Sequence, residues 1–288
     1  MSIKYNEVTI KKWAILSLFF LLLCYNTTNA QTNEKKPWFY GMYFQWGYNR
    51  ESYSKSNIHF SLSNGDRFTL HRAKANDSPD FGAILKSPGD ISIPQYSYRI
   101  GFYLNPDKTR AVEINFDHMK YVVTDYQKVL VTGTIDHQPV HGDSILNPGS
   151  FLHLEHTDGA NLLHINYLQQ NTLFGTKKTD RKLLTWLWKV GAGINIPRTD
   201  FTWRGERLNN KFHIAGYNTS AETAIRLYPF KKIFIEASGK AGYVNYLNAL
   251  ANTPTQKGNR VNHDFFYVEA IATIGFDINF HASGNAGF

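Results

Sequence analysis

Apolar and polar side chains alternate along eight separate stretches of this chain. In residues 38–48 the even positions read Trp, Tyr, Met, Phe, Trp and Tyr, and the odd positions are smaller or more polar on balance. Successive side chains of a β-strand point to opposite faces, so a period of two predicts a strand with one apolar face. Large aromatic residues on one face, with glycine and polar residues on the other, are typical of a barrel strand that faces lipid.

Seven further stretches repeat the pattern, which makes the strand count even. The longest is the last, where every even position from Phe266 to Phe280 is apolar. The eight predicted strands cover residues 38–48, 95–104, 112–117, 163–167, 184–196, 220–227, 233–242 and 266–280. We therefore predict an all-β fold, namely an eight-stranded, antiparallel, up-and-down transmembrane β-barrel.

The connections between these stretches alternate between long and short. The long ones cover roughly residues 49–93, 124–159, 197–212 and 248–264, and the short ones 105–109, 169–182 and 229–232. Outer-membrane barrels alternate in this way because they have long extracellular loops and short periplasmic turns. The sequence Asn105-Pro106-Asp107 has the residues of a tight turn.

The first thirty residues have the layout of a secretory signal peptide. Three lysines precede an apolar run at 13–24, and Ala30 supplies a small residue at the cleavage point. The run is too short for a membrane-spanning helix, which needs about 20 residues. The predicted organisation is a cleaved signal peptide at 1–30, a periplasmic segment at 31–37, the barrel at 38–280, and a tail or strand end at 281–288.

Composition narrows the compartment and the partners. The single cysteine, Cys24, lies in the predicted signal peptide, so a large core or a closed hydrogen-bonded sheet, rather than disulfides, must hold the exported chain together. The formal net charge is +8. For an exported protein we expect no nucleic acid partner, and we expect contact with outer-membrane lipid and anionic lipopolysaccharide.

The strand count, the lipid-facing aromatic residues and the alternating connections resemble the small outer-membrane barrels typified by the OmpA transmembrane domain and OmpW. The resemblance is architectural and covers residues 38–280, with no diagnostic motif. It implies an integral outer-membrane protein of a Gram-negative bacterium. Phe288 at the end of the chain and the alternating run at 276–280 are both similar to the signal that barrel-assembly machinery reads, which implies this machinery as a partner during insertion.

The predicted inward positions carry charges of both signs. They are Arg99, Glu113, Asp117, Lys189, Glu222, Arg226, Glu236, Lys240, Glu269 and Asp277. An eight-stranded barrel is just wide enough for its own side chains to fill it, and an unpaired buried charge is costly. We therefore predict a structural network of ion pairs in the lumen. A narrow or gated polar pore and a proton or ligand site are the alternatives.

The densest group of potential metal ligands is His153, Glu155, His156 and Asp158. Imidazole and carboxylate groups bind zinc and similar ions. Strand alternation, however, places His153 and Glu155 on one face, and His156 and Asp158 on the other. We therefore expect a polar strand end near the outer interface, with no metal, no cofactor and no catalytic residues.

The overall prediction is a non-enzymatic outer-membrane protein with a structural, adhesion or surface-recognition role. The first long connection has some 45 residues, and loops of this length are often functional, so it is the expected site of partner contact. Arg204, Arg207 and Lys211 are candidates for contact with lipopolysaccharide phosphates. One alternative is a lipid A-modifying acyltransferase or deacylase, with a histidine base such as His118, His156 or His164. Another is a narrow channel for small solutes.

Overall fold

The computed structural model describes residues 37–78, 95–176 and 181–280 of the 288-residue chain. The predicted signal peptide and C-terminal tail lie outside these residues, and so does part of the first long connection. The described residues include no helix of the length and hydropathy needed to cross a bilayer.

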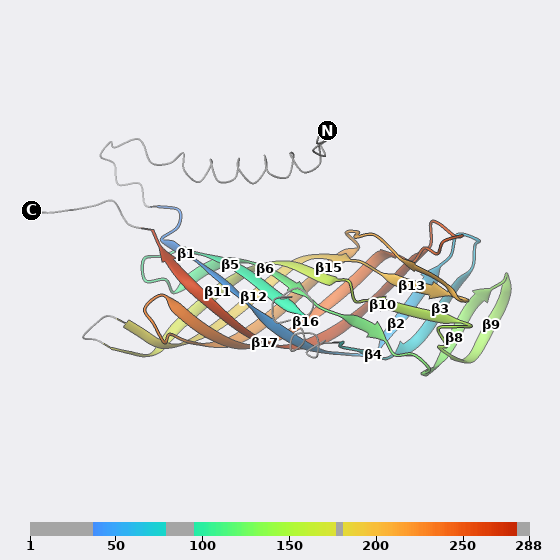
Figure 1. Cartoon of the computed structure of the whole chain (residues 1–288), viewed down its shortest axis with the longest axis horizontal. Coiled ribbons are helices and arrows are strands. Elements are labelled where there is room, and N and C mark those ends of the chain that lie inside the picture. Colours follow the sequence, from blue (N-terminus) through green and yellow to red (C-terminus); the bar gives the residue numbers. More distant parts are fainter. Residues whose placement is uncertain (1–36, 79–94, 177–180, 281–288) are drawn as a thin grey trace, which may run out of the picture. The chain divides into compact units, whose positions relative to one another are not determined.

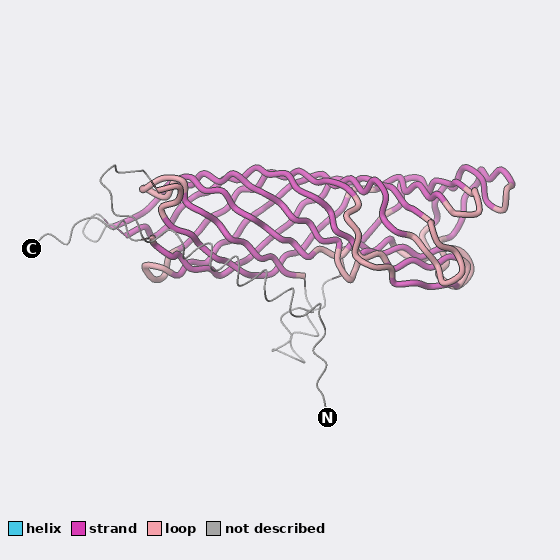
Figure 2. Tube along the Cα trace, turned by 90° about the horizontal axis from the view of Figure 1, so that it is seen from above, coloured by secondary structure: helices cyan, strands magenta, loops and turns pink. Residues whose placement is uncertain are grey.

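Eight antiparallel strands form a closed ring (Figures 1 and 2). They are β1 (Gly41–Tyr53), β5 (Tyr96–Tyr103), β6 (Arg110–His118), β11 (Ala160–Thr176), β12 (Arg181–Pro197), β15 (Gly216–Leu227), β16 (Ile233–Leu250) and β17 (Arg260–Asn279). Each strand pairs with the next along the ring, and β17 returns to pair with β1, so that Gly41 lies opposite Asn279. A closed ring leaves no unpaired sheet edge, which is the condition for crossing a bilayer with strands. The predicted barrel is confirmed.

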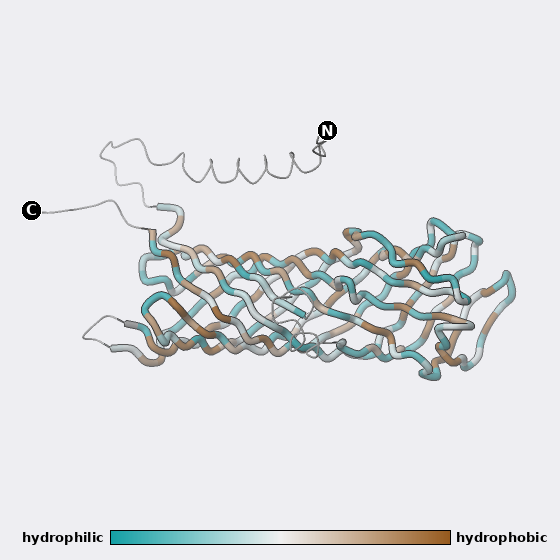
Figure 3. The backbone as a smooth tube through the Cα atoms, in the orientation of Figure 1, coloured by the Kyte–Doolittle hydropathy of each residue, from teal (hydrophilic) through white to brown (hydrophobic). Residues whose placement is uncertain are grey.

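Hydrophobic and hydrophilic residues alternate along the strands of the ring (Figure 3), and the outward positions are apolar. On β17 the outward positions are apolar from Phe266 to Ile278. Asn262 and Asp264, which precede this run in the strand, are exposed and polar. At the usual rise and tilt of barrel strands, this run spans about 30 Å, close to the hydrocarbon thickness of a bilayer. The outward-facing side chains on the other strands include Ile114, Ile165, Trp186, Val190, Ile225 and Ile235.

Short turns close one end of the ring, where β1 begins and β17 ends. The carboxamide oxygen of Asn105 accepts hydrogen bonds from the backbone N–H groups of Thr109 and Arg110, at 3.0 Å each, and so holds the β5–β6 turn. The predicted turn at 169–182 was wrong in extent, because β11 and β12 remain paired as far as Thr176 and Arg181. The residues there are largely polar, so the apolar alternation ends before the backbone pairing does.

At the opposite end the long connections contain short strands of their own, which the sequence pattern did not predict. The strands β2 (Ser56–Ser61), β3 (Arg67–Ala73), β8 (Lys128–Ile135) and β9 (Gln138–Ile145) continue the barrel sheet outward from β17. A second sheet contains β14 (Glu206–Asn209), β13 (Asp200–Trp203), β10 (Leu152–His156), β7 (Tyr121–Val123) and β4 (Ala75–Asn76). We call these nine strands the outer cap.

The outer cap has its own apolar core. Phe60 stacks on Phe68 with ring centres 4.9 Å apart, Phe68 stacks on Trp203 at 5.1 Å, and Phe60 stacks on Phe201 at 5.6 Å. Burial of one such side chain contributes roughly 1.5–3 kcal/mol. The same core continues down into the barrel through Phe265 on β17. The cap is therefore a folded extension of the barrel.

The barrel interior is filled in layers. A small apolar cluster lies near the turn end and includes Tyr43, Tyr103, Leu187 and Phe234. Tyr43 fits because the inward position opposite it is Gly101, where a Cβ atom would lie 2.0 Å from the tyrosine ring. Buried polar and charged residues separate this cluster from the core that the cap shares with the barrel.

Candidate functional site

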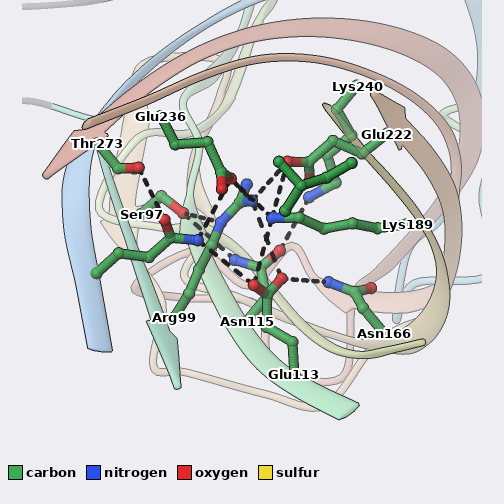
Figure 4. A network of polar contacts seen from close by, with 12 residues as sticks. Ser97, Arg99, Glu113, Asn115, Asn166, Lys189, Glu222, Glu236, Lys240 and Thr273 are labelled. Atoms are coloured by element: carbon green, nitrogen blue, oxygen red, sulfur yellow. Dashed lines mark hydrogen bonds and ion pairs between the residues drawn. The ribbon is translucent and has the colours of Figure 1, made fainter. Parts of the chain in front are cut away.

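The middle of the barrel holds four basic side chains that are almost completely buried. Figure 4 shows three of them, Arg99, Lys189 and Lys240, with their partners. Arg99 comes from β5, Lys189 from β12, Arg226 from β15 and Lys240 from β16. Each occupies an inward position of its strand, and the residues immediately before and after it face outward. Charges so far from water persist only when they are paired.

Glutamates from three strands surround Arg99 and Lys189. The guanidinium Nη1 of Arg99 lies 2.6 Å from Glu222 Oε1. The ammonium group of Lys189 lies 2.9 Å from Glu236, 3.1 Å from Glu222 and 3.3 Å from Glu113. Glu113 also accepts hydrogen bonds from Tyr43 and Asn166, at 2.5 and 3.0 Å. The two cations therefore share one set of carboxylates.

Arg226 joins this network to the apolar cluster at the turn end. Its Nη2 atom lies 2.7 Å from Glu236 Oε2. The face of the guanidinium lies over the rings of Phe234 and Tyr43, with its central carbon 3.9 and 4.7 Å from the ring centres. Cation–π contacts of this kind stabilise a desolvated cation.

Lys240 is the basic centre of the side nearer to the cap. Its ammonium group bonds to Asp117 and lies 3.5 Å from Glu269. The imidazole of His164 lies 3.6 Å from the same aspartate, and Asn49 donates to Glu269 at 2.7 Å. Nine of the ten predicted lumen residues are thus in mutual contact or share partners within the interior.

Asp277, the tenth, has no ion pair with the others and, among the described residues, is linked to them only through Tyr103, which accepts a hydrogen bond from Arg226 at 3.5 Å. It is only partly buried at the turn end, where the Tyr103 hydroxyl donates to it at 2.7 Å. The interior also holds residues that the sequence interpretation did not select. They include Tyr43, Gln45, Asn49, Glu51 and Asn115. Their inward strand positions were the available signal, and they complete the hydrogen bonding of the charges.

The predicted polar cluster of β10 divides between the two faces of the strand. His153 lies between two carboxylates, with Nδ1 2.6 Å from Asp125 and Nε2 3.3 Å from Glu155. His156 points into the cap core, where Nε2 lies 3.1 Å from His263 Nε2. Asp158 lies beyond the strand and pairs with Arg198 at 3.4 Å. Among the described residues, no group of three or more such side chains could hold a metal ion.

His153 gives the cap a pH-dependent contact. Its hydrogen bonds to Glu155 and then Asp125 raise the pKa of its imidazole to about 9. A raised pKa stabilises the folded cap fully below about pH 6.5, and this contribution is lost as the pH rises through 9. We expect His153→Gln to lower cap stability by about 1 kcal/mol at pH 6.5, since the pair is partly exposed. The difference in melting temperature between the two proteins should vanish near pH 10; a constant difference would contradict this role.

Two of the three predicted lipopolysaccharide contacts are occupied within the cap. Arg204 forms a two-pronged pair with Asp136, at 2.9 and 2.5 Å, and Arg207 lies 2.6 Å from Asp200. Each of these two charges is therefore paired with a carboxylate of the cap, and both arginine side chains remain exposed. Lys211 is exposed.

One face of the cap is flat and polar. Asn262, His59, Thr69, Thr132 and His141 lie side by side across β17, β2, β3, β8 and β9. His59 bonds to Thr69 at 2.8 Å, and the neighbouring His71 bonds to Thr132 at 2.7 Å. The adjacent row contains Arg260, Ser61, Arg67 and Thr134. We call these two rows, with His71, the outer sheet face.

Comparisons with known proteins return similar solved structures only. No protein-family model matches the chain, and no curated protein does. OprG from Pseudomonas aeruginosa is 12% identical, with 85% of this chain and 98% of that chain covered and a TM-score of 0.42. Neisserial surface protein A is 9% identical, with 83% and 97% covered and a TM-score of 0.34. Ail of Yersinia pestis, in complex with the heparin analogue sucrose octasulfate, is 8% identical, with 83% and 99% covered and a TM-score of 0.32.

The assignment of this chain rests on its own geometry. Eight strands close into a ring, their outward residues form an apolar band, and the charged residues are paired inside. Only a bilayer accounts for such an exterior on a closed barrel. The chain is therefore a small, eight-stranded, integral outer-membrane β-barrel protein.

Proposed function

We propose that this protein is a non-enzymatic outer-membrane barrel that uses its outer cap for recognition at the cell surface. The observation that supports this most directly is the buried core of the cap, which includes Phe60, Phe68, Phe201 and Trp203. A binding surface needs a fixed shape, because ordering a mobile loop on binding costs free energy. The cap supplies a folded surface beyond the membrane.

The packed interior favours recognition over transport. The paired charges around Lys189 lie between two apolar clusters, one with Tyr103 and Phe234 and the other with Phe265 and Tyr267. A solute that passed along the axis would have to displace both clusters and separate buried ion pairs. Such a rearrangement costs several kcal/mol for each broken pair.

The histidines considered as catalytic bases also favour a non-enzymatic role. His156 and His164 are fully buried, whereas a general base must lie within hydrogen-bond reach of its substrate. His118 stacks on the ring of Tyr96 at 4.6 Å and bonds to Asn161 at 2.8 Å. These contacts give all three histidines structural roles among the described residues.

The outer sheet face is the proposed contact surface. Its hydroxyl, imidazole and guanidinium groups can donate hydrogen bonds to a polymer rich in hydroxyl and acidic groups. Arg67 and Arg260 carry positive charge there, and neither has an ion pair within 4 Å among the described residues. We therefore propose an anionic polysaccharide as the ligand class. The residues of this face come from the first, second and fourth predicted long connections, so the proposed partner contact extends beyond the first loop.

Binding to dextran sulfate, with neutral dextran as the matched probe, tests this proposal. We expect the refolded protein in detergent to bind immobilised dextran sulfate and not dextran. The double variant R67Q/R260Q should bind at least fivefold more weakly, and K108Q/K232Q, which makes the same charge change at the turn end, should bind like the parent. Equal binding by all three proteins would contradict a role for the outer sheet face, and solute flux through protein-containing liposomes would contradict the non-channel assignment.

A further inference from the structure

The turn end of the barrel contains a cavity of about 520 Å³ that the proposed function does not use. It lies between the β5–β6 turn, the start of β12, the β15–β16 turn and the end of β17. The buried rings of Tyr103 and Tyr228 line it, and the apolar cluster with Tyr43 and Phe234 separates it from the interior. The cavity is therefore a blind pocket, and its volume lies within the range of small-molecule sites, roughly 300–1,000 Å³.

Four lysines line this pocket: Lys108, Lys182, Lys231 and Lys232. The Lys108 ammonium group bonds to the side-chain oxygen of Asn279 and lies 5.1 Å from the centre of the Tyr103 ring. Lys182 donates to the main-chain carbonyl of Asp107 at 2.8 Å. Within the part of the chain that the structure describes, none of the four lysines has an ion pair within 4 Å.

The two carboxylates of the pocket do not balance these charges. Asp277 accepts its hydrogen bond from the Tyr103 hydroxyl at 2.7 Å, and Asp107 meets Lys182 through its main chain. Among the described residues that line the pocket, four lysines against two aspartates leave a net charge of +2. Burial lowers the pKa of Lys108, and the nearby charge of Lys232 lowers it further against the opposing effect of Asp277. The lysines thus repel one another across the pocket.

We propose that this pocket binds a phosphate group, either that of a small phosphate ester or that of an anionic phospholipid. Phosphate oxygens accept several charge-assisted hydrogen bonds at once, and lysine is a common phosphate ligand. An anion seated between Lys108 and Lys232 would relieve their repulsion. The pocket opens where the barrel strands end, at the level of lipid headgroups, and it has room for a glycerol-sized group beside the phosphate. This site is independent of the proposed recognition role.

Two binding measurements on the full refolded barrel distinguish the sources of phosphate. In detergent, calorimetric titration with glycerol 3-phosphate measures a free ester, with sodium chloride at matched ionic strength as the control. In nanodiscs of phosphatidylethanolamine and phosphatidylglycerol, native mass spectrometry measures retained lipid. K108Q/K232Q removes the central cations, and R67Q/R260Q makes the same charge change at the other end. A heat-dependent shift in gel mobility confirms that each variant is folded.

We expect the parent protein to bind in at least one of the two measurements. K108Q/K232Q should weaken that binding at least tenfold, and R67Q/R260Q should change it less than twofold. Binding of glycerol 3-phosphate in detergent would identify the ligand as a free phosphate ester. Selective retention of phosphatidylglycerol in nanodiscs would identify it as a phospholipid. Absence of binding by the parent in both measurements, or binding by K108Q/K232Q within twofold of the parent, would overturn the proposal.

Discussion

Replacing Glu236 by glutamine is expected to destabilise the barrel strongly, by about 3–5 kcal/mol. One oxygen of Glu236 lies 2.9 Å from Lys189 and 3.6 Å from Arg99, and the other lies 2.7 Å from Arg226. Glutamine keeps the size of the side chain but removes the charge, so three buried cations lose a shared partner. The measurement is the urea concentration at which the heat-dependent gel shift is lost.

Asp143→Asn is the matched control for this change. Asp143 pairs with Lys128 at 2.9 Å, but both side chains are more than half exposed on the cap. Exposed pairs of this kind contribute between 0 and about 1 kcal/mol. Equal effects of the two substitutions would mean that the interior carboxylates are hydrated and that the ion-pair network does not stabilise the barrel.

Acid is expected to open the cap. Burial lowers the pKa of His156 to about 3, whereas an exposed histidine has a pKa of about 6.5. The opened cap therefore takes up the proton first, so the contribution of His156 to stability is intact above about pH 6.5 and declines as the pH falls towards 3. At about 1.4 kcal/mol per pH unit, the loss reaches about 2 kcal/mol by pH 5.

Hydrogen exchange at pH 7.5, 6 and 5 would follow this opening, after correction for the intrinsic exchange rates. We expect protection to fall with pH in β10 and β2 and to persist in β12 and β15. The double variant H156F/H263F retains rings in this aromatic part of the core, where His156 lies 4.8 Å from Tyr246, and should lose most of the dependence. Protection of β10 that does not change between pH 7.5 and 5 would rule out the histidine pair as the cause.

The barrel strands were predictable because the bilayer imposes its pattern on a long stretch of chain. Along β17 the alternation persists from Phe266 to Ile278, which no soluble strand requires on its exposed face. The cap strands have a weaker alternation of apolar and polar residues in the sequence. In β2 only Ile58 and Phe60 are apolar inward residues, and in β3 only Phe68, Leu70 and Ala73 are. β2 and β3 pair with each other, but their second partners, β17 and β8, come from distant parts of the chain, so these short patterns were interpreted as loops.

The candidate site, too, was predictable only in part. Inward positions could be assigned from alternation, and the opposite faces of His153 and His156 followed in the same way. Contacts across the barrel could not be predicted, since they depend on strand tilt and register. Asp277 lies at the turn end, outside the ion-pair network of the lumen, because its strand ends there. The lysines that line the pocket at the turn end are separated by up to 124 positions in the sequence, 232 minus 108. Only the closure of the ring brings them together.

The continuity of β17 has a mechanical consequence. This strand of 20 residues runs from the turn end to the cap, where it pairs with β2 through Arg260–His263 and with β1 over the rest of its length. Tension on the β2–β3 side of the cap reaches the barrel along the strand direction, as shear spread over many hydrogen bonds that must yield together. If the cap binds a surface while the cell is pulled away from that surface, the force is transmitted through β17 to the barrel wall, and the cap does not separate from the barrel first.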